Sequence, residues 1–141
     1  GVPIAAGERL LSRWEFRELF ESGGVAVVQP DVMHAGGLTE VRKIADLAEL
    51  YYIPVAPHNP AGPIATLASI HLAAAIPNFR VLENMEEERG LREKICPSMP
   101  PLRKGGFDVP EAPGLGAEID LSAIAAMARR PQPRDNRPWW G

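Results

Sequence analysis

Four residues whose side chains can transfer protons or bind metals recur at nearly even spacing along the 141-residue chain: Glu8, Asp31, His58 and Glu83. The intervals between them are 23, 27 and 25 residues, which is the length of one strand, one loop and one helix. Each residue follows a short apolar run that is typical of a buried parallel strand. The spacing therefore predicts a repeated βα unit that brings one such side chain per repeat to a common rim, where parallel barrels assemble their chemistry.

The residue types at this rim indicate a particular chemistry. A carboxylate beside a histidine selects the tautomer of the imidazole and raises its basicity, so Asp31 and His58, on neighbouring strand ends, are candidates for a general-base pair. Glu8 is a candidate ligand for Mg²⁺, which prefers oxygen donors. Glu83 lies beyond His58, where a carboxylic acid could bond a substrate oxygen that gains charge. A base, a metal and an acid around one cavity predict proton abstraction next to a substrate carboxylate, through an enediolate.

Each of these residues also has a purely structural explanation. Glu8 could be a solvated loop carboxylate, Asp31 could cap a helix or form an Asx-turn, and Glu83 could belong to the acidic run that follows it. His58 is harder to explain in this way, because the prolines in Pro57-His58-Asn59-Pro60 fix the backbone around it. The recurrence of chemically able side chains at the same register of four successive repeats favours a functional explanation.

The elements that must position these residues can be predicted from apolar patterning. The predicted strands are 2–6, 25–28, 53–56 and 79–82. A first helix is expected to open at Ser12, which has the capping-box spacing to Glu15, and to end at Gly23-Gly24. Trp14, Leu19 and Phe20 can share one face of this helix. Two more are expected over 38–51 and 64–76, the latter preceded by Pro63 and buried on most sides.

The pattern changes after Glu83, which divides the chain into a partial barrel of four βα repeats over residues 1–85 and a second region over 86–141. Residues 86–106 are charged and rich in proline and glycine, which predicts an irregular excursion across a surface. Further elements are a turn at 113–116, a strand-like segment at 117–119, a helix from Leu121 to Arg130 opened by Asp120 or Ser122, and an extended tail over 131–141.

Composition narrows the possible partners and location. A net charge of −3 with both signs intermixed, 45% hydrophobic and 23% charged residues predict a soluble globular protein with no footprint for nucleic acid or an anionic membrane. Cys96 is the single cysteine, which excludes an intrachain disulfide and fits a reducing compartment. Without a membrane span or a leader segment, we expect a cytoplasmic location.

The number of repeats raises a separate question. Four repeats are half of the eight in a closed barrel, and half a barrel leaves two unpaired parallel edges that stable proteins cover. The chain begins at Gly1 inside an apparent strand and without an initiator methionine. We therefore expect that it belongs to a longer polypeptide or that two copies associate.

Several motifs, in this order, resemble the C-terminal half of an enolase-superfamily enzyme of the mandelate racemase/muconate lactonizing subgroup, most closely an acid-sugar dehydratase of the galactonate type. These motifs are Ala6-Gly7-Glu8-Arg9-Leu10, Gln29-Pro30-Asp31, His34-Ala35-Gly36-Gly37, Ala56-Pro57-His58, Gly62-Pro63-Ile64 and Pro113-Gly114-Leu115-Gly116. The resemblance implies an α/β fold made of strands 5–8 of a TIM-type (β/α) barrel, followed by a segment that returns to complete a capping domain.

The resemblance also implies roles for individual residues. Glu8 would be the third of three carboxylate ligands to Mg²⁺, and Asp31 and His58 would form the family's dyad. Glu83 would be the acid that steadies the substrate carboxylate or the enediolate, and His34 would contact the substrate. The other two metal ligands and a second acid/base catalyst would lie on earlier barrel strands.

The implied function is a Mg²⁺-dependent dehydratase that acts on a small-molecule sugar acid, as a homo-oligomer of the full-length protein. His58 would remove the proton α to the carboxylate, and the β-hydroxyl would leave as water to give a 2-keto-3-deoxy acid. Two alternatives stay open: a racemase or epimerase of the same superfamily, and a half-barrel module that does no chemistry. The sugar acid is not specified by the sequence, and this chain alone is expected to be inactive.

Overall fold

The computed structural model describes residues 1–127, in which strands and helices alternate over the first two repeats. The first elements are β1 (Ala5–Ala6), α1 (Arg13–Glu21), β2 (Val27–Val28), α2 (Gly37–Leu50) and α3 (Pro63–Ala75). They are followed by the 3₁₀ turn η1 (Glu86–Glu88), α4 (Arg89–Ile95) and α5 (Leu121–Met127). The predicted tail over 131–141 and the last predicted helical residues, 128–130, lie outside the described residues.

Four chain segments run parallel to one another in sequence order. β1 pairs with β2, with Ala5 opposite Val27, and single parallel bridges join Val28 to Val55 and Val55 to Phe79. The predicted order of strands is confirmed, but their lengths are wrong. The segments 53–56 and 79–82 pair through a single bridge. In it the N–H of Val55 donates to the carbonyl of Asn78 and the carbonyl of Val55 accepts from the N–H of Arg80, at 2.8 Å in each bond.

The first helix begins where its capping signal predicts. The N–H of Ser12 donates to Oε2 of Glu15 at 2.8 Å. Phe16 and Phe20 bury the inner face, as expected for residues four apart. The prediction that Trp14 lies on this face is wrong: it is 63% exposed and stacks under the Arg13 guanidinium, 4.9 Å from the ring centroid, because a position two residues from Phe16 points to the opposite side.

The core lies between the helices and the parallel segments. α2 buries Val41, Ile44, Ala45 and Ala48, and these residues join Phe16, Phe20, Val28 and Val55 in one cluster. α3 begins with Pro63 and buries seven of its thirteen residues, which confirms the prediction of a helix buried on most sides. Its polar side chains Thr66 and Ser69 are buried as well.

The C-terminal region is more regular than the sequence suggested. The expectation of an irregular segment over 86–106 is wrong for its first part, where η1 and α4 form. The charged side chains there pair at helical spacing. Nη1 of Arg89 lies 3.3 Å from Oε1 of Glu86, and its Nε lies 2.9 Å from Oε1 of Glu93. The part from Pro97 onward contains no helix before α5.

The elements predicted further along the chain are confirmed in part. The turn at 113–116 forms, closed by the N–H of Gly116 and the carbonyl of Pro113 at 3.3 Å. No strand forms at 117–119, because the N–H of Glu118 bonds the Ser98 hydroxyl instead of another strand. Asp120 opens α5 by accepting from the N–H groups of Ser122 and Ala123 at 2.9 and 3.0 Å.

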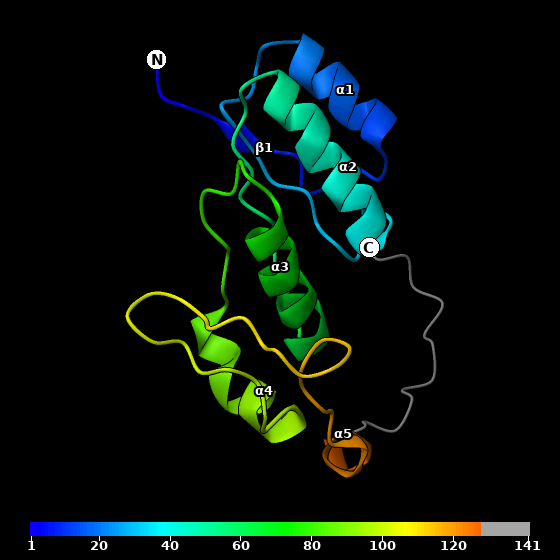
Figure 1. Cartoon of the computed structure of the whole chain (residues 1–141), viewed down its shortest axis with the longest axis vertical. Coiled ribbons are helices and arrows are strands. Elements are labelled where there is room, and N and C mark those ends of the chain that lie inside the picture. The colour runs from blue at the N-terminus through cyan, green and yellow to red at the C-terminus, as the bar shows by residue number, and fades with distance from the viewer. Residues whose placement is uncertain (128–141) are drawn as a thin grey trace, which may run out of the picture.

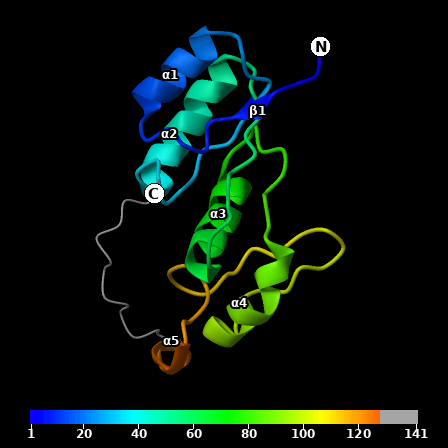
Figure 2. The same cartoon turned by 180° about the vertical axis from the view of Figure 1, so that it is seen from behind.

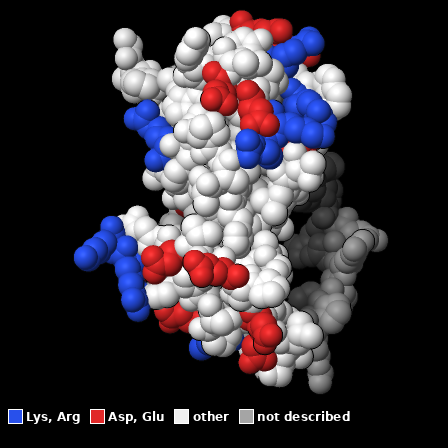
Figure 3. All heavy atoms as spheres, in the orientation of Figure 1, with Lys and Arg blue, Asp and Glu red and all other residues white. Residues whose placement is uncertain are grey.

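The molecule is elongated, with α1 and α2 side by side at one end, α3 in the middle, and α4 and α5 at the other end (Figures 1 and 2). On the face drawn in Figure 3, basic and acidic side chains lie beside one another near the α1–α2 end. No described helix is long and apolar enough to cross a membrane.

Both outer segments of the parallel array carry exposed apolar side chains. Val2 and Ile4 precede β1 on one side, and Phe79 and Val81 lie on the other. Within residues 1–127 no further strand pairs with either segment. The structure thus has the two open edges expected of four adjacent barrel strands.

Candidate active site

The backbone ladder continues past the strands and brings their polar ends to one rim. Beyond β1, the N–H of Gln29 donates to the carbonyl of Ala6 at 2.9 Å. The N–H of His58 donates to Pro30 at 3.2 Å, and the N–H of Glu83 donates to Pro57 at 3.4 Å. Because each bond joins a polar residue to the end of the neighbouring segment, the parallel register itself places these residues side by side.

Asp31 and His58 form a direct pair. Oδ2 of Asp31 lies 2.9 Å from Nδ1 of His58. The Asp31 residue is only 3% exposed, and its other oxygen, Oδ1, accepts the N–H of Met33 at 2.7 Å. Asp31 thus forms an Asx-turn through Oδ1 and the pair with His58 through Oδ2. A carboxylate can only accept here, so the bond places the proton of a neutral His58 on Nδ1 and leaves the lone pair on Nε2.

Glu83 stands on the other side of the imidazole. Its Oε2 lies 3.9 Å from Nε2 of His58, which is too long for a hydrogen bond. The same oxygen accepts the N–H of Asn59 at 3.0 Å, and the Asn59 side chain donates to the carbonyl of Glu83 at 3.1 Å. Glu83 is therefore held through both its side chain and its backbone, and its carboxylate faces the imidazole without a bond to it.

The backbone that leads to Glu8 is shaped by the glycine before it. Gly7 has φ +127°, and a Cβ added there would lie 2.9 Å from Cε1 of Phe16 and 3.3 Å from Cγ2 of Val28. Only glycine fits this close approach and this backbone angle. The carbonyl of Glu8 lies 3.4 Å from Nδ1 of His34, so the residue that follows Gly7 lies beside the Asp31 loop.

His34 lies between two of the predicted site residues. Besides the Glu8 carbonyl, its Nδ1 lies 3.9 Å from Oδ2 of Asp31, and its side chain is about half exposed. The structure therefore brings His34, Glu8 and Asp31 to the same rim, where an exposed imidazole is available to a ligand.

The donor chemistry of Glu8, a partly buried residue, fits Mg²⁺, because a carboxylate offers the hard oxygen that this ion prefers. No group of three or more histidine, cysteine or acidic residues that could hold a metal occurs in the described part of the chain. The Glu8 carboxylate can therefore supply one oxygen ligand to such an ion.

Sequence reasoning overlooked two buried polar residues at this rim. Asn59 is 1% exposed, and its side chain joins Glu83 to the Thr66 hydroxyl, 3.1 Å away in α3. Its position between two prolines was a signal for a fixed loop conformation. Arg92 is also buried, and no local pattern in its charged segment distinguished it from the arginine one turn earlier.

Comparison with known proteins agrees with this geometry. Residues 1–123 match the family model described as enolase C-terminal domain-like. The chain is 44% identical over 125 residues to a D-xylonate dehydratase of Haloferax volcanii, in a match that covers 89% of this chain and 30% of that protein. It is 39% identical over 145 residues to a D-galactonate dehydratase of Ralstonia nicotianae, in a match that covers 99% of this chain and 38% of that protein.

Solved structures give the same result. A mandelate racemase/muconate lactonizing enzyme of Jannaschia sp. superposes with a TM-score of 0.87 at 33% identity, covering 94% of this chain and 34% of that one. An enolase of the mandelate racemase subgroup from Agrobacterium tumefaciens superposes with a TM-score of 0.79 at 40% sequence identity, and the match covers 88% of this chain and 33% of that one. The chain spans about a third of the length of these relatives. It belongs to the enolase superfamily, mandelate racemase/muconate lactonizing subgroup, and its α/β fold corresponds to the C-terminal half of the barrel.

Proposed function

We propose that this chain is the C-terminal part of a Mg²⁺-dependent acid-sugar dehydratase of the galactonate type. The observation that carries the proposal is the 2.9 Å contact between Asp31 and His58, which leaves Nε2 of the imidazole free to act as a base. Two of the relatives are named sugar-acid dehydratases. The substrate is therefore proposed to be a small sugar acid.

His58 is the base in this proposal. With its proton on Nδ1 and bonded to Asp31, the imidazole accepts the substrate's α-proton at Nε2, and the Asp31 carboxylate stabilises the resulting imidazolium. The His58 side chain is 21% exposed and that of Asp31 is 5% exposed, so the imidazole can reach substrate from one side while its partner is shielded on the other.

Glu83 is the proposed partner of the charge that develops on the substrate. In its protonated form the carboxyl donates a hydrogen bond to a carboxylate or enediolate oxygen, and the bond from Asn59 holds one of its oxygens in place. Because Nε2 of His58 and Oε2 of Glu83 lie 3.9 Å apart without bonding each other, the imidazole can face the α-carbon of a substrate whose carboxyl group Glu83 contacts.

Glu8 would supply one ligand to Mg²⁺, with two more carboxylates from barrel strands outside this sequence. When bound, the ion would supply positive charge for the oxygens of the substrate that gain negative charge. His58 would take the α-proton, and the second acid/base catalyst expected on an earlier barrel strand would protonate the β-hydroxyl so that it leaves as water. The enol that remains would tautomerise to a 2-keto-3-deoxy acid. His34 is proposed to bind the substrate from the half-exposed position it occupies beside Glu8.

The domain division is part of the same proposal. Residues 1–85 would form barrel strands 5–8, and residues 86–141 would return to complete a capping domain. The full-length protein would be a homo-oligomer in the cytoplasm.

The test uses the full-length protein that contains this sequence, with Mg²⁺, incubated in D₂O with xylonate, galactonate, gluconate or mannonate. We expect a 2-keto-3-deoxy acid from at least one of them, and no product from His58→Asn or Asp31→Asn. Turnover retained in both variants would overturn the assignment of the base. Deuterium at the α-carbon of unchanged or epimerised substrate, without keto acid, would identify a racemase or epimerase instead. An absence of both reactions with every sugar acid would favour a non-catalytic module.

A further inference from the structure

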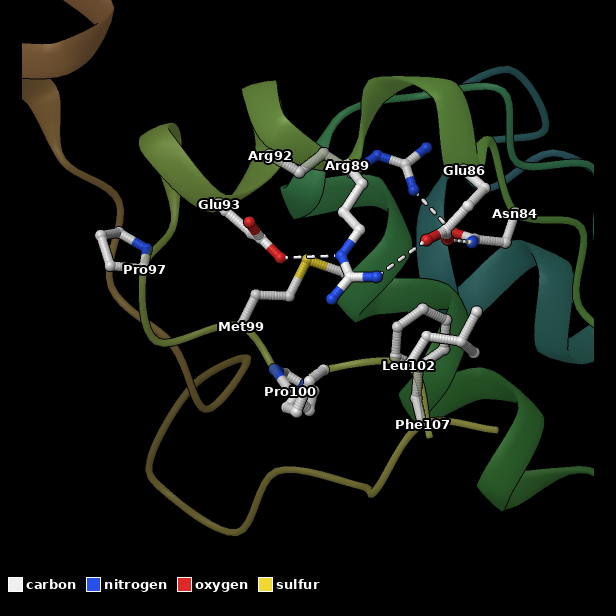
Figure 4. Close-up of a pocket in the computed structure, with 11 residues that line it drawn as sticks. Asn84, Glu86, Arg89, Arg92, Glu93, Pro97, Met99, Pro100, Leu102 and Phe107 are labelled. Carbon is white, nitrogen blue, oxygen red and sulfur yellow. Dashed lines mark hydrogen bonds and ion pairs between the residues drawn. The ribbon is translucent and has the colours of Figure 1, made fainter. Parts of the chain in front are cut away.

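Arg92 connects the two loops that carry His58 and Glu83. Its Nη1 donates to Oδ1 of Asn84 at 2.6 Å, and its Nη2 donates to the carbonyl of Ala61 at 2.9 Å. Asn84 directly follows Glu83, and Ala61 lies three residues after His58. Figure 4 shows Arg92 reaching from α4 toward Asn84, at the edge of a cavity of about 370 Å³. One guanidinium thus joins the segment after one proposed catalytic residue to the loop after the other.

The surroundings of this guanidinium are unusual for a buried charge. Arg92 is 5% exposed, both of its bonds go to neutral oxygens, and its Nε has no partner among the described residues. No carboxylate within residues 1–127 lies at ion-pair distance from it. Burying a charge in this way destabilises the fold, so stability alone does not explain an arginine here. The presence of an arginine is explained by its planar guanidinium, which can bond acceptors on two separate segments at once.

Asn84 is held in the orientation that Arg92 requires. Its Nδ2 donates to Glu86 at 3.1 Å, which turns Oδ1 toward the guanidinium. Glu86 is held in turn by Arg89, and Arg89 by Glu93 on α4 (Figure 4). The position of the rim segment after Glu83 is therefore tied to α4 at more than one point.

The connection continues to the catalytic groups through Asn59. This residue lies between His58 and Ala61, and both its N–H and its side chain bond Glu83. A shift of the 59–61 loop relative to residues 83–84 would lengthen these bonds and move the Glu83 carboxylate away from Nε2 of His58. The distance between the two catalytic side chains thus depends on the link that Arg92 makes.

We propose that Arg92 is a positioning residue that sets the distance between His58 and Glu83 without touching the substrate. This inference rests on the function proposed above for these two residues. It assigns a role in the reaction to α4, a helix outside the repeats that carry the proposed site.

The test compares Arg92→Gln with Arg42→Gln in the full-length protein. Arg42 is a matched control, because its guanidinium also bonds a distant backbone carbonyl, that of Ala75 at 2.6 Å, but between α2 and the end of α3. Arg92→Gln is expected to lower kcat by about 10- to 100-fold with KM changed less than about 3-fold, since small misplacements of catalytic groups have large effects. Arg42→Gln is expected to stay within about 2-fold of the wild type in kcat, because it lies away from the rim. Arg92→Lys, which keeps the charge but not the fork, is expected to recover part of the loss.

A double-mutant cycle separates positioning from general destabilisation. If Arg92 acts through Glu83, the Arg92→Gln change should lower kcat much less in a Glu83→Gln background than in the wild type. The proposal would be overturned if Arg92→Gln lowered kcat by the same factor in both backgrounds. It would also be overturned if Arg92→Gln and Arg42→Gln lowered kcat equally. If Arg92→Gln does not fold, Asn84→Ala takes its place in this test, because it removes one of the two acceptors of Arg92 from a half-buried position.

Hydrogen exchange provides a readout that needs no activity. The amide of Asn59, and those of its neighbours His58, Ala61 and Gly62, should exchange faster in Arg92→Gln than in wild type, because the Asn59 N–H loses its bond to Glu83. Exchange of the same amides should be unchanged in Arg42→Gln. Unchanged exchange in Arg92→Gln would overturn the link even if the wild type makes no keto acid. A wild type that is inactive but shows the expected exchange pattern would refute the proposed function and leave the link intact.

Discussion

Asp31 uses its two carboxylate oxygens for two different partners, with Oδ2 2.9 Å from Nδ1 of His58 and Oδ1 2.7 Å from the N–H of Met33. One oxygen orients an imidazole and the other closes the turn that leads to α2. Position 31 therefore combines a structural and a chemical task, and substitutions there can separate the two.

Asp31→Asn is expected to keep the fold and lose the chemistry. The amide oxygen can still accept from Met33, but the amide nitrogen would donate to Nδ1 of His58 and move the imidazole proton to Nε2, so kcat should fall by roughly 10³- to 10⁴-fold. Asp31→Ala removes both bonds and should also lower the free energy of unfolding by about 1–3 kcal/mol. Steady-state kinetics and urea unfolding measure the two effects. A fully active Asp31→Asn would refute the role of the pair.

Asn59→Ala is expected to loosen the rim. The change deletes the side-chain bonds to the carbonyl of Glu83 and to Thr66 from a site that is 1% exposed, and should lower the free energy of unfolding by about 1–3 kcal/mol. Thr66→Ser keeps the hydroxyl and is the control, with a smaller loss. Denaturant unfolding compares them, and equal stability of Asn59→Ala and wild type would show that these bonds contribute nothing.

Gly7→Ala is expected to destabilise the protein strongly. At φ +127° with Phe16 2.9 Å from the new methyl group, the loss should be roughly 2 kcal/mol or more. Gly90→Ala is the opposite case, because Gly90 lies in α4 with no atom within 4 Å of an added Cβ, and the change should stabilise by about 0.5–1 kcal/mol. Thermal unfolding measured for both variants checks the contrast. Similar effects of the two alanines would contradict the conformation assigned to Gly7.

The ion pair between α1 and α2 predicts a dependence of stability on pH. Hydrogen bonds from the Arg13 guanidinium, the shorter at 2.7 Å, lower the pKa of Glu40 below its ordinary value. A lowered folded-state pKa gives stability that is present above the unfolded pKa, about 4.3, and is lost as pH falls through the lower folded value.

Glu40→Gln should therefore lower the unfolding temperature at pH 7 and have a diminishing effect below about pH 4. Glu49→Gln, an exposed change on the same helix, is the control. Differential scanning calorimetry from about pH 3 to 7 spans the carboxylate titration and gives both curves. A difference between Glu40→Gln and wild type that does not shrink at low pH would exclude the ion pair as its source.

Local sequence signals predicted much of the fold. The capping residues at Ser12 and Asp120, the proline that opens α3, and the alternation of apolar runs with helical patterns each act within a few residues, and the structure confirms them. The repeat length alone predicted that Asp31, His58 and Glu83 share one rim, because parallel strands of equal spacing end at the same edge.

Contacts between residues far apart in the chain could not be predicted in this way. Asn59 and Arg92 reach partners 24 and 31 residues away, at Glu83 and Ala61, and no local pattern encodes such contacts. Trp14 is exposed and Phe16 is buried because of where α2 packs. The order and spacing of residues thus specify which side chains gather at the rim, whereas packing between distant segments specifies how those side chains are held. The physical reason is that burial and long-range hydrogen bonds form only when the whole chain has folded.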